Sequence, residues 1–122
     1  MDDSLFKKLN LKAGMTLCVI APYDDFAHFL KAQKAFEIVT HDADFVLVFV
    51  RERAELIQRI DEAKQARKSG GKLWLAYPKA TSTHKPDINR DSLFELTQGY
   101  GLIINGNFAL DEQWSLLRTK DI

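Results

Sequence analysis

Several kinds of chemistry are scarce or missing in this sequence. Only one of its 122 residues is a cysteine, so no disulfide can form within the chain. No apolar run approaches the roughly 20 residues that a membrane-spanning helix needs. Lys plus Arg and Asp plus Glu both number 17, so the formal net charge is zero and nothing indicates a polyanionic partner. We therefore expect neither a nucleic-acid partner nor a membrane partner.

Motifs for covalent and metal chemistry are missing too. The chain contains no Gly-x-Ser-x-Gly, His-Glu-x-x-His or P-loop pattern, so the usual hydrolase, zinc-protease and nucleotide-hydrolase templates find no match. Its first residues, Met1-Asp2-Asp3, lack the basic and apolar segments of a signal peptide. Together with the single cysteine, this favours the reducing cytosol, and we expect a cytoplasmic protein.

The composition that is present is ordinary for a globular protein, with 46% apolar and 28% charged residues. We expect a single domain over residues 1–122. Three apolar runs rich in branched and aromatic residues predict buried strands: Met15–Ala21, Phe45–Val50 and Lys72–Tyr77. Helical spacing of apolar residues predicts a helix over Glu52–Lys68, with Gly70 as the residue that ends it.

The remaining segments alternate in the same way. Asp24 or Asp25 is expected to cap a second helix, and Asp87 or Asn89 a third, where Ser92-x-x-Glu95 has the spacing of a capping box. Further strands are expected over Phe36–Thr40, Leu102–Leu110 and Trp114–Thr119, the last two joined as an antiparallel hairpin. The prediction is a three-layer, Rossmann-like α/β domain with a mostly parallel sheet and a C-terminal antiparallel hairpin.

This order resembles the second half of a class I S-adenosylmethionine-dependent methyltransferase. Asp44–Val50, the helix that follows and Gly70–Leu75 look like the fourth and fifth strands of that fold with their connecting helix. The resemblance implies a Rossmann-like sheet that ends in a reversed hairpin strand.

The chain resembles still more closely a bacterial family of short Rossmann-like domains of unknown function. The landmarks are Val50-Arg51-x-Arg53-Ala-Glu-Leu56, Leu73-Trp-x-Ala-Tyr-Pro-Lys79, Arg90-Asp91 and Asp111-Glu-x-Trp-Ser-x-Leu-Arg118. This resemblance implies a fold and brings no known activity with it.

The turn after the first strand departs from the methyltransferase pattern. A methyltransferase needs glycines there, so that the backbone can approach the cofactor. Here the turn reads Ala21-Pro-Tyr-Asp-Asp-Phe26, in which Pro22 removes an N–H donor and Tyr23 adds bulk. We therefore expect a truncated cofactor pocket, in which Asp24, Asp25 and Asp42 are weak candidates for contacts to a ribose.

The basic residues at the strand ends are the main candidates for a ligand site. Ligands of open parallel sheets bind beyond the carboxyl ends of the strands. Arg51 and Lys79 follow two such strands, and Arg90 begins the helix after the Lys79 loop. With the hydroxyls of Thr81 and Thr83, these cations could hold a phosphate or a carboxylate.

Each candidate also has a purely structural interpretation. Arg51 could pair with Asp87 or Asp91, and Lys79 could be solvated. Adjacent carboxylates after a strand usually favour the start of the next helix. The acidic run His41–Asp44 is too short and too poor in further ligands to imply a metal. Cys18, inside a predicted strand, is expected to be buried and inert.

Two functions from different classes follow. The first is a non-catalytic module, without a cofactor, that binds an anionic small molecule or a protein partner; a homodimer through the edge hairpin is compatible with either function. The second is an enzyme, a reduced methyltransferase that uses S-adenosylmethionine. The sequence favours the first, because no nucleophile–base pair is evident, and leaves catalysis open.

Overall fold

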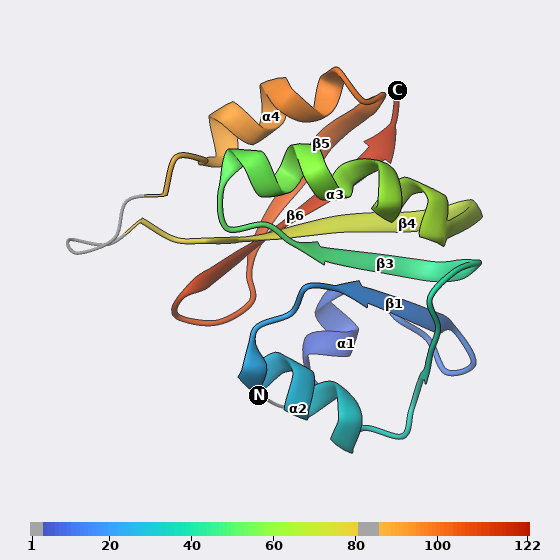
Figure 1. Cartoon of the computed structure of the whole chain (residues 1–122). Coiled ribbons are helices and arrows are strands. Elements are labelled where there is room, and N and C mark those ends of the chain that lie inside the picture. Colours follow the sequence, from blue (N-terminus) through green and yellow to red (C-terminus); the bar gives the residue numbers. More distant parts are fainter. Residues whose placement is uncertain (1–3, 81–85) are drawn as a thin grey trace.

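The computed structural model of the chain describes residues 4–80 and 86–122. Six strands form one sheet in the order β2-β1-β3-β4-β6-β5, and helices cover both of its faces (Figure 1). The strands are β1 (Thr16–Ile20), β2 (Glu37–Ile38), β3 (Ala43–Phe49), β4 (Arg67–Pro78), β5 (Leu102–Ala109) and β6 (Trp114–Asp121). The helices are α1 (Ser4–Lys8), α2 (Asp24–Ala32), α3 (Arg53–Ala66) and α4 (Arg90–Gln98). The predicted three-layer α/β fold is confirmed.

Strand β3 lies in the middle of the sheet. It pairs in parallel with β1 on one side and with β4 on the other, as the three apolar runs predicted. Phe45, Leu47 and Phe49 point into the core layer beneath α1 and α2, whereas Val46 and Val48 point toward α3 and α4. Because both faces of the strand are covered, its sequence is a continuous apolar run and does not alternate.

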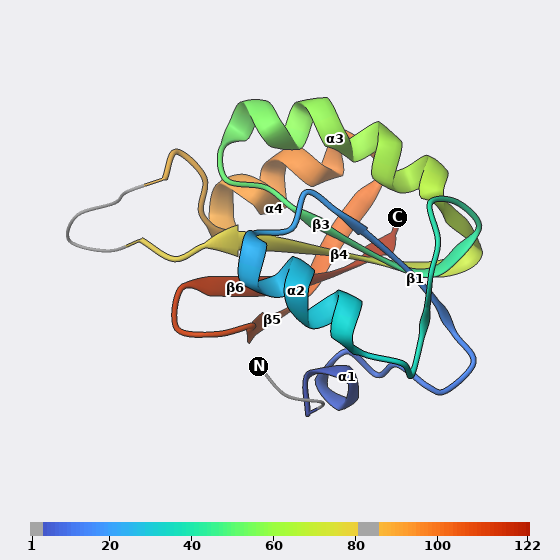
Figure 2. The ribbon, with the colours of Figure 1, turned by 60° about the horizontal axis from the view of Figure 1, so that its bottom comes forward.

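Helix α3 connects β3 to β4 and packs through Leu56, Ile60 and Ala63. Figure 2 shows it on the same side of the sheet as α4, with α1 and α2 on the other side. Within the described part of the chain, no helix is long and apolar enough to cross a membrane.

The predicted role of the double glycine is wrong. Helix α3 ends at Ala66, two residues before Lys68, and Gly70 lies inside β4 with a φ of 80°. Ala43 pairs with Arg67 and Phe45 pairs with Lys72, so β4 contributes four residues where β3 contributes one. Glycine fits this bulge because a Cβ on Gly71 would lie 2.8 Å from the carbonyl oxygen of Ala43.

Of the predicted helix caps, the one for α2 is wrong and the one for α4 is confirmed. The N-cap of α2 is Tyr23, without a side-chain hydrogen bond, and Asp24 and Asp25 lie in the first turn, where carboxylates favour the positive end of the dipole. The N-cap of α4 is Asn89, whose side chain accepts a 2.9 Å hydrogen bond from the Ser92 amide. Asn89 is one of the two predicted caps, and only the capping box differs, because it starts at Asn89 and not at Ser92.

The C-terminal hairpin is confirmed, with β6 between β4 and β5. Arg118 of β6 lies opposite Trp74 of β4, and its guanidinium lies 5.5 Å from the ring centre of Phe108. Gly106 makes this possible, because a Cβ there would lie 2.9 Å from the Phe108 ring and 3.2 Å from the guanidinium carbon of Arg118.

The packing of β3 gives a first prediction. Phe49 is fully buried, with its ring centre 5.1 Å from that of Phe26 and 5.2 Å from that of Trp114. Phe49→Ala should lower the free energy of unfolding by about 3–5 kcal/mol, because it leaves a cavity among rigid rings. Urea denaturation measures this loss. Phe94→Ala on α4, where the side chain is 38% exposed, should cost clearly less; a similar cost at both positions would contradict this account.

Candidate functional site

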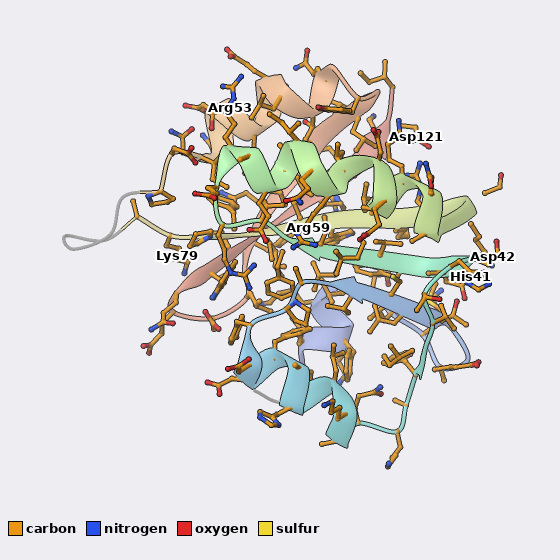
Figure 3. The ribbon with its side chains drawn as sticks, viewed as in Figure 1. His41, Asp42, Arg53, Arg59, Lys79 and Asp121 are labelled. Atoms are coloured by element: carbon orange, nitrogen blue, oxygen red, sulfur yellow. The ribbon has the colours of Figure 1, made fainter. Side chains whose placement is uncertain are left out.

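The carboxyl ends of β1, β3 and β4 lie at one edge of the sheet, where parallel sheets bind their ligands. Three segments meet there: the turn after β1, the residues after β3 and the end of β4. Lys79 follows β4 at this edge, and Figure 3 shows it at the opposite end of the sheet from His41 and Asp42. Lys79 therefore lies at the edge where a ligand is expected, and the acidic run lies at the far edge of the sheet.

The turn after β1 has an unusual backbone. Ala21 has a φ of 58°, in the left-handed region that favours glycine and costs other residues about 1–2 kcal/mol. The carbonyl oxygen of Ala21 accepts a 3.0 Å hydrogen bond from Nη2 of Arg51. This turn is thus held by a side chain from the end of β3, although it contains no glycine.

Aromatic side chains fill the space beside this turn. The rings of Tyr23 and Trp114 stack with centres 5.3 Å apart and planes 9° apart, and the Arg51 guanidinium lies 5.5 Å from the Trp114 ring centre. Tyr23 donates a 2.5 Å hydrogen bond from its hydroxyl to Oδ2 of Asp111. Burial, and then this bond to a carboxylate, raise the pKa of Tyr23 well above its ordinary value.

Arg51 also binds a carboxylate beside this cluster. Its Nη1 lies 3.0 Å from Oε2 of Glu55, and its backbone N–H donates to Oε1 of the same carboxylate at 2.6 Å. The predicted partners Asp87 and Asp91 are not used by Arg51; Asp87 instead accepts a 2.8 Å bond from the backbone N–H of Arg53.

Lys79 and Arg90, in contrast, line one cavity of about 380 Å³. It lies between the end of β4, the start of α4 and the β5–β6 hairpin. The Lys79 ammonium donates a 2.9 Å bond to the carbonyl oxygen of Asp111, and the Arg90 side chain is 61% exposed, with Asp91 at 3.8 Å. The cavity residues with hydrogen-bonding or charged side chains include Tyr77, Lys79, Asn89, Arg90, Asn107 and Ser115.

The structure therefore brings two of the three predicted cations together. Arg51 contacts Trp114 in the core layer of α1 and α2, whereas Arg90 belongs to α4 on the other face of the sheet. Thr81 and Thr83 lie outside the described residues, and their predicted roles stay predictions.

Sequence reasoning missed Asp111, which connects the two groups. Its Oδ1 accepts bonds from the amides of Gln113 (2.7 Å) and Trp114 (2.8 Å), while Oδ2 binds Tyr23 and its carbonyl oxygen binds Lys79. An Asp that opens a tight turn before a strand is the local signal for the first two bonds. No local signal predicts the last two.

The acidic run lies at the other end of the sheet, and within it Asp44 has a structural role. Asp44 accepts bonds from the amide (2.8 Å) and the hydroxyl (3.1 Å) of Thr16 and forms an ion pair with Lys68. Asp42 occupies a left-handed turn with a φ of 53°. Among the residues that the structure describes, no group of three His, Cys, Asp or Glu side chains is arranged to hold a metal ion.

Cys18 is 5% exposed and lines a groove between β1 and α3, together with Arg59 and Glu62. Burial, and then the negative charge of Glu62, raise the pKa of its thiol. A raised pKa disfavours the reactive thiolate. The predicted burial of this cysteine is confirmed.

No protein-family model matches the sequence, and no curated protein matches it significantly. Solved structures do match. A SAM-dependent methyltransferase from Aquifex aeolicus matches 98% of this chain and 89% of its own, with a TM-score of 0.64 and 11% identity. The glycopeptide N-methyltransferase MtfA matches 98% of this chain and 88% of its own, with a TM-score of 0.61 and 9% identity.

A third match is LepI, solved as a complex with SAM, which covers 98% of this chain but only 39% of its own, with a TM-score of 0.59 and 10% identity. Identities this low show the fold alone. The chain has a Rossmann-like, methyltransferase-type fold, as its resemblance to class I methyltransferases implied. The closer resemblance to a bacterial family of short domains stays a prediction.

The Asp44 contacts predict a pH-dependent stability. The ion pair with Lys68, followed by the Thr16 bonds, lowers the pKa of Asp44 from 3.8 to about 2. A pKa lowered by folding means that the ionised carboxylate stabilises the fold above about pH 4, and that this contribution is lost as the pH falls toward 2. Asp44→Asn should therefore unfold at lower urea concentration than wild type at pH 6, with a difference that shrinks between pH 4 and pH 2.

Asp42→Asn is the matched control, because it removes the same charge two residues away and asparagine tolerates the left-handed backbone. This variant should keep wild-type pH dependence. A wild type–Asp44→Asn difference that stays constant from pH 6 to pH 2 would mean that charge at this position does not stabilise the fold.

Proposed function

We propose that this chain is a non-catalytic binding domain that holds a small anion in the cavity between Lys79 and Arg90. The observation that carries the proposal is the convergence of these two cations on one cavity at the carboxyl edge of the sheet. Anion sites need several donors as well as charge. The Asn107 amide and the Ser115 hydroxyl, which line the same cavity, supply donors of that kind.

The contents of the turn after β1 favour binding over methyl transfer. A methyltransferase cofactor would lie beside this turn, and here the stacked rings of Tyr23 and Trp114, with Arg51 over the Trp114 ring, occupy the neighbouring volume. Opening that volume would break the Tyr23–Asp111 bond and leave a half-buried carboxylate without one of its donors. The aromatic cluster therefore supports a site elsewhere on the edge.

Inorganic phosphate is the probe that tests the proposal. In an amide-resolved NMR titration, phosphate should shift resonances of Lys79, Arg90 and Asn107. Lys79→Gln and Arg90→Gln should each weaken binding by roughly 1.5–3 kcal/mol, the value of a charge-assisted hydrogen bond. Glutamine at position 79 keeps a donor for the Asp111 carbonyl, so stability should change little. Asp91→Asn should strengthen binding, because it removes a negative charge from the lining.

Lys120→Gln is the matched control, since Lys120 is exposed on β6 and lies outside this cavity. Phosphate binding should be unaffected by it. Equal weakening by Lys120→Gln and by the cavity variants would reduce the effect to general charge. Shifts confined to other parts of the chain would place the anion somewhere else.

A reduced methyltransferase is the alternative, and the match of SAM-dependent methyltransferase structures to 98% of the chain favours it. Under the proposal, calorimetry with S-adenosylmethionine should give a dissociation constant no tighter than about 1 mM, near −4 kcal/mol. The physical reason is the filled volume beside Ala21. A micromolar constant would reverse the ranking and make Asp24 and Asp25, in the first turn of α2, the first residues to replace.

A further inference from the structure

A second cavity adjoins the proposed anion site. It has a volume of about 430 Å³ and runs along β5 beneath α4. Arg90, Asp91 and Asn107 line both cavities, so the two cavities are neighbours that share these residues. Beyond them, the second cavity is bounded by the apolar side chains of Phe94 and Ile104.

Phe94 is the unusual member of this lining. Leu93 and Thr97 form the buried face of α4 and are fully covered. Phe94 follows Leu93 in the helix and therefore lies beside that face, where it is partly exposed. Its ring is 38% exposed, whereas all other phenylalanines of the described chain are less exposed. Phe94 on one side and Ile104 on the other give this cavity apolar walls, and Arg90 lies at the side that it shares with the first cavity. We call the part between Phe94 and Ile104 the apolar slot.

We infer that the anion bound at Lys79 and Arg90 carries a flat apolar or aromatic group, which lies against Phe94 and Ile104. This inference rests on the proposed anion site and specifies its ligand class as an aryl phosphate or a similar amphipathic anion. Arg90 sets the geometry, because it reaches the anion from one cavity and lines the second. A group attached to the anion then enters the apolar slot past Asn107.

The charges of the slot agree with this occupant. Arg90 is the cation common to both cavities, and the 93% exposed Asp91 is the only carboxylate among their described lining residues. A second cationic group on the ligand would meet Arg90, and a second anionic group would meet apolar walls. A neutral aromatic group on the ligand is compatible with both Arg90 and Phe94, since aromatic rings stack on guanidinium planes and on phenylalanine rings.

Methyl phosphate and phenyl phosphate, titrated in parallel at pH 8, test this inference. The two carry the same charge, so any difference reports the ring. Wild type should bind phenyl phosphate about three- to tenfold more tightly, as stacking on one aromatic side chain allows. Phe94→Ala should remove this advantage and leave the affinity for methyl phosphate unchanged. Ile57→Ala, at another exposed apolar position on α3, should change neither affinity.

The possible failures are distinguishable. If methyl phosphate does not bind, the anion site itself is wrong, and the inference falls with it. If methyl phosphate binds at the cavity and phenyl phosphate binds no more tightly, or its advantage survives Phe94→Ala, the aromatic slot is wrong and the anion site stands. Concentration-dependent sedimentation that Phe94→Ala abolishes would assign the slot to a second copy of the chain and overturn the ligand inference. Phe94→Leu provides a second variant should Phe94→Ala not fold.

Discussion

Strand β3 is paired in parallel on both sides, and every side chain from Phe45 to Val50 is at most 1% exposed. A strand in this position has no water to satisfy its amides and carbonyls, so the neighbouring strands must supply all the partners. It also needs an apolar layer on each face. The crossover helix α3 and the pair α1 and α2 supply those layers, and the remaining elements are arranged around them.

The same pairing creates the edge where a ligand can bind. Parallel strands end together, so the segments after β1, β3 and β4 are brought to one side of the sheet although they are distant in sequence. In this chain the β1 and β3 ends are closed by Tyr23, Trp114 and Arg51. The β4 end carries the cavity with Lys79. Asp111 joins the two parts, since its carboxylate binds Tyr23 and its carbonyl oxygen binds Lys79.

This arrangement separates fold from function. A methyltransferase-type sheet is preserved over nearly the whole chain, and the volume beside its first turn is filled by the protein's own aromatic side chains. Fold similarity at about 10% identity therefore fixes the positions of the strand ends without fixing what they bind. The chemistry depends on which side chains project from those ends.

The sequence by itself determined the main strands, the mostly parallel sheet and the C-terminal hairpin, because continuous apolar runs and tight turns are local signals. It also located the cations at the strand ends. Only the tertiary structure decided that Gly70 serves a bulge opposite Asp44 and does not end a helix. It alone showed that Arg51 binds Glu55 and covers Trp114, whereas Lys79 and Arg90 share a cavity. Arg51 and Trp114 are 63 positions apart in the sequence, and no local pattern records which side chains a sheet will bring together.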